Sequence, residues 1–80
     1  MYIENFKLGK IIKIEVEKEY GNVTFMDVLE DFGYIHYGKI IELKGKDVDV
    51  FEKGEKKYIF KNGEHDNGWI HSFLIQEVEI

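Results

Sequence analysis

The chain has 80 residues with no cysteine and no proline, and its 16 acidic residues outweigh 11 lysines to give a formal net charge of −5. This length predicts one domain, residues 1–80, whose thin core must fold without disulfides. Arginine is absent, and because arginine reads phosphate and guanine with two parallel hydrogen bonds, recognition of nucleic acid is disfavoured.

The first predicted element is a strand over residues 8–18. Ile12, Ile14 and Val16 alternate with charged residues, which is the period of a strand with one buried face. A turn is predicted over residues 19–22, where a glycine and an asparagine interrupt the alternation.

The hydrophobic period then changes, and a short helix is predicted over residues 25–32. Thr24 suits the N-cap, and Asp27 stands where a capping box places its second residue. Gly33 stands where a helix commonly ends in a left-handed residue. The apolar residues that follow one helical face are Phe25, Val28, Leu29 and Phe32. Two turns are too few for an isolated helix, so this face must pack on a sheet.

Strand composition returns after the helix, with a bulge or a bend predicted at Gly38. Lys53-Gly54 is predicted to turn the chain between two further strands, and Asn62-Gly63 to open a loop that continues to Gly68. Residues 69–73 fit either a short strand or a helical turn, and residues 74–80 form the last strand.

This order predicts an α+β domain with one helix after the first strand. The connections are too short for parallel crossovers, so about five antiparallel strands should form a small barrel or a strongly curled sheet. Residues 37–79 resemble the small SH3-like barrels of phages and prophages, through the hairpin around Gly54, the Gly/Asn loop and Gly68-Trp69-Ile70-His71 before the final strand. The resemblance implies an SH3-like barrel that acts by binding.

The histidines and carboxylates offer few signs of catalysis. Glu64, His65 and Asp66, with His71, form the one grouping that suggests a metal, but their spacing matches no established metal motif. No phosphate-binding loop and no nucleophile motif occurs. We therefore expect a protein that is not an enzyme and that needs no cofactor and no metal.

The twelve aromatic residues exceed what a thin core can hide, which favours an exposed binding face. Trp69 and His71 should share one side of a strand, and for Trp69 a plug of the barrel is slightly favoured over a role in binding. Tyr34 and His36 should likewise share a strand face, with either a binding or a sheet-surface role. The predicted binding residues are Trp69, His71, Tyr34, His36, His65 and Asp66.

Small size, acidity and surplus aromatics favour an accessory protein of a phage or mobile element. It would act by binding and inhibiting a host protein, such as one of a defence system, in the cytoplasm of a bacterial host. The first alternative is a homo-oligomer that binds a small, nucleotide-like molecule. The second is an SH3-like nucleic-acid module that meets phosphates through Lys53, Lys56, Lys57 and Lys61. No apolar run approaches the roughly 18 residues of a membrane span, and the first residues do not resemble a signal peptide, so no membrane partner is expected.

Overall fold

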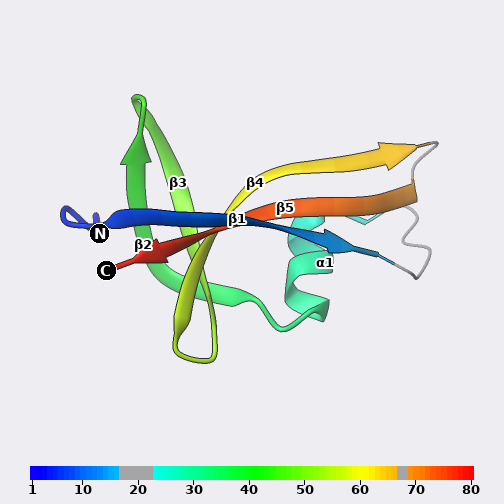
Figure 1. Cartoon of the computed structure of the whole chain (residues 1–80), viewed down its shortest axis with the longest axis horizontal. Helices are drawn as coiled ribbons and strands as arrows, with labels where there is room; N and C mark the ends of the chain where they lie inside the picture. The colour runs from blue at the N-terminus through cyan, green and yellow to red at the C-terminus, as the bar shows by residue number, and fades with distance from the viewer. Residues whose placement is uncertain (17–22, 67–68) are drawn as a thin grey trace.

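A single antiparallel sheet and one short helix make up the described chain (Figure 1). The computed structural model describes residues 1–16, 23–66 and 69–80, so the predicted turn at 19–22 lies outside it. The elements are β1 (Lys7–Glu15), α1 (Phe25–Asp31), β2 (Ile35–Leu43), β3 (Lys46–Lys53), β4 (Lys56–Asp66) and β5 (Trp69–Glu79). The five strands follow the order β1-β5-β4-β3-β2, which confirms the predicted small antiparallel sheet with a helix after the first strand.

Local sequence sets both ends of α1. Thr24 accepts a hydrogen bond from the backbone N–H of Asp27, and the Asp27 carboxylate accepts one from the backbone N–H of Thr24, which confirms the capping box. Gly33 has a φ of +91°, and the N–H groups of Gly33 and Tyr34 donate to Glu30 and Leu29 in a Schellman motif. The helix therefore begins where the sequence predicts and ends at Asp31, one residue earlier than predicted, with Phe32 as its C-cap.

Both faces of the sheet are buried, in two separate cores. Neighbouring residues of a strand point to opposite faces, yet Val50 is 0% exposed and Phe51 only 4% exposed. The first core packs Val28 and Leu29 of α1 against one face of the sheet. The second core lies on the other face and includes Ile3, Ile41, Val50, Ile59 and Val78. A sheet that covers a core on each face within 80 residues must curl, as the turned β2–β3 end in Figure 1 shows.

Residues 1–3 precede β1, at one edge of the sheet, and pair with β2, at the other edge. An antiparallel run of five strands leaves β1 and β2 parallel, and Tyr2 accordingly forms a parallel bridge with Ile40. The Ile3 N–H donates to the Ile40 carbonyl at 2.8 Å, and the Ile40 N–H donates to the Met1 carbonyl at 3.0 Å. The Tyr2 hydroxyl adds a hydrogen bond to Asp47 at 2.8 Å.

Bulges allow two strands to bend. The β2–β3 register shifts between His36 and Ile40, and Gly38 there has a φ of +85°, which confirms the predicted bulge. A second shift lies in β1, where the Gln76 side chain donates to the Gly9 carbonyl at 2.9 Å. A Cβ on Gly9 would lie 3.1 Å from the Glu77 Cβ, so the absence of a side chain lets β1 approach β5.

The predicted turn at Asn62-Gly63 is wrong. Both residues lie inside β4, which continues to Asp66 opposite Trp69, and residues 69–73 form the first half of β5 rather than a helical turn. The physical reason is packing, because a Cβ on Gly63 would overlap the ring of Phe25. This glycine makes room for the aromatic ring at the start of α1. The turn at Gly54, where φ is +65°, is confirmed between Lys53 and Lys56.

We expect Gly63→Ala to destabilise the fold by about 1–3 kcal/mol, because the added methyl group overpacks the contact with Phe25. Urea denaturation measures the loss. In a Phe25→Ala background the same substitution should cost almost nothing. An unchanged midpoint for the single variant would contradict the packing role of Gly63.

Candidate functional site

At the end of the β4–β5 hairpin, the predicted binding residues His65, Asp66 and Trp69 do not all lie on one face of the sheet. Asp66 pairs with Trp69 across the hairpin, and His65 pairs with Ile70, which is 5% exposed in the core that α1 covers. The His65 ring lies 6.3 Å from the Phe25 ring, on the side of the helix. Trp69 and Asp66 therefore lie on the opposite face, and Trp69, 42% exposed, does not plug the sheet.

His71 is exposed and lies at a bulge in the β4–β5 pairing. Glu64 pairs with Ser72 and His65 with Ile70, so His71 is an extra residue without a partner in β4. Trp69 and His71 are both exposed, with the buried Ile70 between them. Among the described residues, no three or more His, Asp or Glu side chains gather as a metal site would require.

Tyr34 and His36 meet at one small pocket of about 110 Å³, although Tyr34 precedes β2. Tyr34 is buried, with its ring edge-on to that of Tyr58 at 5.3 Å between centroids. His36 is exposed, and its ring lies 4.7 Å from that of Phe51. The sequence thus identified two neighbouring residues, but they differ in burial, so they do not present one exposed strand face.

Apolar side chains surround this pocket on the outside of the molecule. Met26 of α1 is 39% exposed and Ile35 of β2 is 53% exposed, and both line the pocket together with Glu30. Val28 and Leu29 are buried, and Met26, one turn before Leu29, lies at the edge of this buried face and is partly exposed. We call Met26, Glu30, Ile35 and His36 the Met26–Ile35 surface.

Lys53 links α1 to the sheet beside this surface. The Lys53 Nζ, from β3, donates to the Phe32 carbonyl at 2.9 Å at the C-terminal end of α1. The same ammonium lies 4.8 Å from the centroid of the Tyr34 ring. A cation at a helix C-terminus is favoured by the helix dipole, and the last turn of α1 has no basic residue of its own. Lys53 therefore fixes α1 relative to the sheet.

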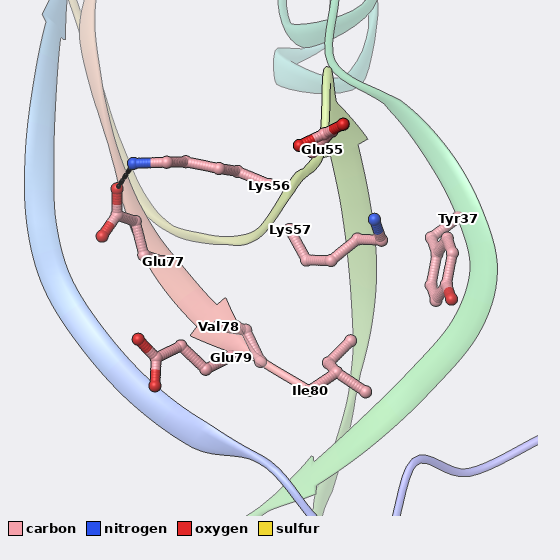
Figure 2. A pocket seen from close by; sticks show the side chains of 8 residues that line it. All are labelled: Tyr37, Glu55, Lys56, Lys57, Glu77, Val78, Glu79 and Ile80. Carbon is pink, nitrogen blue, oxygen red and sulfur yellow. Dashed lines mark hydrogen bonds and ion pairs between the residues drawn. The ribbon is translucent and has the colours of Figure 1, made fainter.

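A larger pocket, of about 610 Å³, lies between the β3–β4 turn, the end of β5 and Tyr37 of β2 (Figure 2). The Lys57 Nζ lies 4.7 Å from the Tyr37 ring centroid and 3.5 Å from the Glu52 carboxylate. The Lys56 Nζ lies 3.3 Å from the Glu77 carboxylate. Sequence reasoning missed this pocket, because its walls come from three distant segments that no local motif connects.

Three of the four lysines that the nucleic-acid alternative assigns to phosphate binding contact other groups of the protein. Lys53 binds the end of α1, Lys56 pairs with Glu77, and Lys57 pairs with Glu52. The carboxylates of Glu52 and Glu77 beside Lys57 and Lys56 would also repel a phosphate. This arrangement weakens the nucleic-acid alternative.

Comparison of the chain with protein-family models, curated proteins and solved structures gives no significant match. No relative therefore suggests a role for the residues around either pocket. The α1 helix has seven residues, and no helix in the described part of the chain is long and apolar enough to span a membrane.

Alkaline pH should destabilise the protein through Tyr34. Burial, with a smaller contribution from Tyr58, raises the pKa of the Tyr34 hydroxyl above its ordinary value of 10.0. The unfolded chain therefore ionises first, so this contribution to stability is complete below pH 10 and is lost as pH rises through the folded-state pKa. Denaturation midpoints from pH 8 to 11 should fall less steeply for Tyr34→Phe than for the wild type, since lysine titration is common to both. Equal slopes would contradict this account.

Proposed function

We propose that this protein is a binding module that attaches to another protein through the Met26–Ile35 surface. The observation that carries the proposal is the exposure of two large aliphatic side chains, Met26 and Ile35, beside a pocket with an aromatic floor. Apolar side chains around a concave site are typical of the centre of a protein interface, where an anchor residue of the partner becomes buried.

The charge of the surface limits the kind of partner. Glu30 lines the pocket, and the chain as a whole carries a net charge of −5. A partner that inserts an aliphatic side chain and carries a lysine or arginine beside it would match both features, and the electrostatic attraction would speed association. We therefore propose a basic partner protein with an apolar anchor.

The biological role that fits such a module is inhibition by occupancy. A small accessory protein of a phage or mobile element could bind a host protein, including a defence protein, and block its working surface. Support for this role comes from the size, the acidity and the exposed apolar residues of the chain. We also propose that the curled sheet is a partly closed, SH3-like barrel, which the pairing of residues 1–3 with β2 supports.

An enzymatic role has no positive support among the described residues. His65 and Asp66 lie on opposite faces of β4, and His36 is next to an aromatic ring rather than a nucleophile. Binding without chemistry is therefore the proposal that the geometry supports best.

The proposal is tested by replacing Ile35 with glutamate. Ile35 is 53% exposed, so Ile35→Glu should leave the fold intact, but it places a charge where the partner's apolar residue must become buried. We expect the wild type to recover one basic protein in stoichiometric amount from a bacterial host lysate and the variant to lose at least about tenfold in affinity for the purified partner.

Ile11→Glu is the matched control. Ile11 is 55% exposed and also lies on a strand, but it belongs to β1 and does not line the pocket. It should bind the partner as the wild type does. Equal loss in both variants, or no stoichiometric partner for the wild type, would count against the Met26–Ile35 surface.

A further inference from the structure

We propose that the pocket of Figure 2 binds a small zwitterion with both a free ammonium and a free carboxylate group, such as an amino acid or a dipeptide. This site is separate from the Met26–Ile35 surface, because no residue lines both pockets. The volume of about 610 Å³ lies within the roughly 300–1,000 Å³ common for small-molecule sites.

Opposite walls of the pocket carry opposite charges. Figure 2 shows Lys57 directed toward Tyr37 on one side, and Glu77 and Glu79 on β5 on the other side. Val78 and Ile80 lie between these walls and add apolar surface. A ligand with charges of both signs at its two ends can satisfy both walls at once, and a ligand with one charge cannot.

Lys57 is held in place before any ligand arrives. Its side chain is 19% exposed, and its ammonium lies between the Glu52 carboxylate at 3.5 Å and the Tyr37 ring at 4.7 Å. An ammonium has three N–H donors, so a donor remains for a ligand carboxylate. The Lys39 Nζ lies 5.3 Å from the same ring, but Lys39 does not line the pocket.

Glutamate carboxylates of the pocket would bind the ammonium end of the ligand. Glu77 is already neutralised by Lys56 at 3.3 Å, whereas Glu79 and Glu55 are exposed and line the pocket. Figure 2 shows Glu55 at the β3–β4 turn and Glu79 near the end of β5, so a ligand ammonium on the side opposite Lys57 would meet Glu79. The Glu55 and Glu79 carboxylates would also repel a polyanion such as a nucleotide, and Lys57 would repel a simple cation. The charges therefore select a zwitterion over both.

The test is a titration of the protein with the dipeptide alanyl-leucine, followed by amide chemical shifts in NMR spectra. We expect saturable shifts at Tyr37, Val78 and Ile80, which line the pocket. N-acetylation or C-terminal amidation of the dipeptide should each weaken binding about tenfold or more, because each removes one charged hydrogen bond. No saturable shift, or equal binding of the blocked dipeptides, would overturn the proposal.

Two variants locate the charges. Glu79→Gln should weaken binding of the dipeptide about tenfold but leave binding of its N-acetylated form unchanged, because the lost partner is the ligand ammonium. Lys57→Met should weaken binding of both forms. Since Glu79 is exposed, its variant remains informative even if Lys57→Met fails to fold.

The matched controls are Glu64→Gln and Lys61→Met, which change the same residue types on exposed positions of β4 outside this pocket. Both should bind alanyl-leucine like the wild type. If Glu79→Gln also binds like the wild type, or if the controls weaken binding equally, the assignment of the pocket is wrong.

Discussion

The packing of α1 on the sheet is the interaction on which the rest of the structure depends. Seven residues are far fewer than the roughly 12–15 that an isolated helix needs, so tertiary contacts must supply its stability. Val28 is 0% and Leu29 1% exposed, and each fully buried aliphatic side chain contributes about 1.5–3 kcal/mol. Lys53 adds a hydrogen bond to the carbonyl of Phe32 at the C-terminal end.

The curl of the sheet follows from this packing. The helix covers one face only, yet the strands have apolar residues on both faces, as the buried neighbours Tyr58 and Ile59 show. The sheet must therefore bend to close the second core, and the bulges at Gly9 and Gly38 allow it. The same arrangement places the Met26–Ile35 surface beside the helix and brings the end of β5 near Tyr37, where the larger pocket forms.

The sequence predicts the features that local chemistry controls. The ends of α1, the bulge at Gly38 and the turn at Gly54 follow from residues within a few positions of each other. The turn predicted at Gly63 is wrong because this glycine packs against Phe25, which lies 38 positions earlier in the chain. Tyr34 and His36, two positions apart, line one small pocket, whereas the larger pocket joins Tyr37, Lys57 and Glu79, and nothing in the sequence connects them.

Hydrogen exchange of individual amides tests most directly whether α1 is part of the cooperative fold. The Phe32 and Tyr34 N–H groups donate to Val28 and Leu29 at 3.0 and 2.9 Å. If docking of the helix holds the structure together, these amides open only in global unfolding and exchange with the same free energy as the amides of Ile59 and Ile75 in the sheet. Exchange at nearly unprotected rates in the helix, with the sheet still protected, would contradict the account.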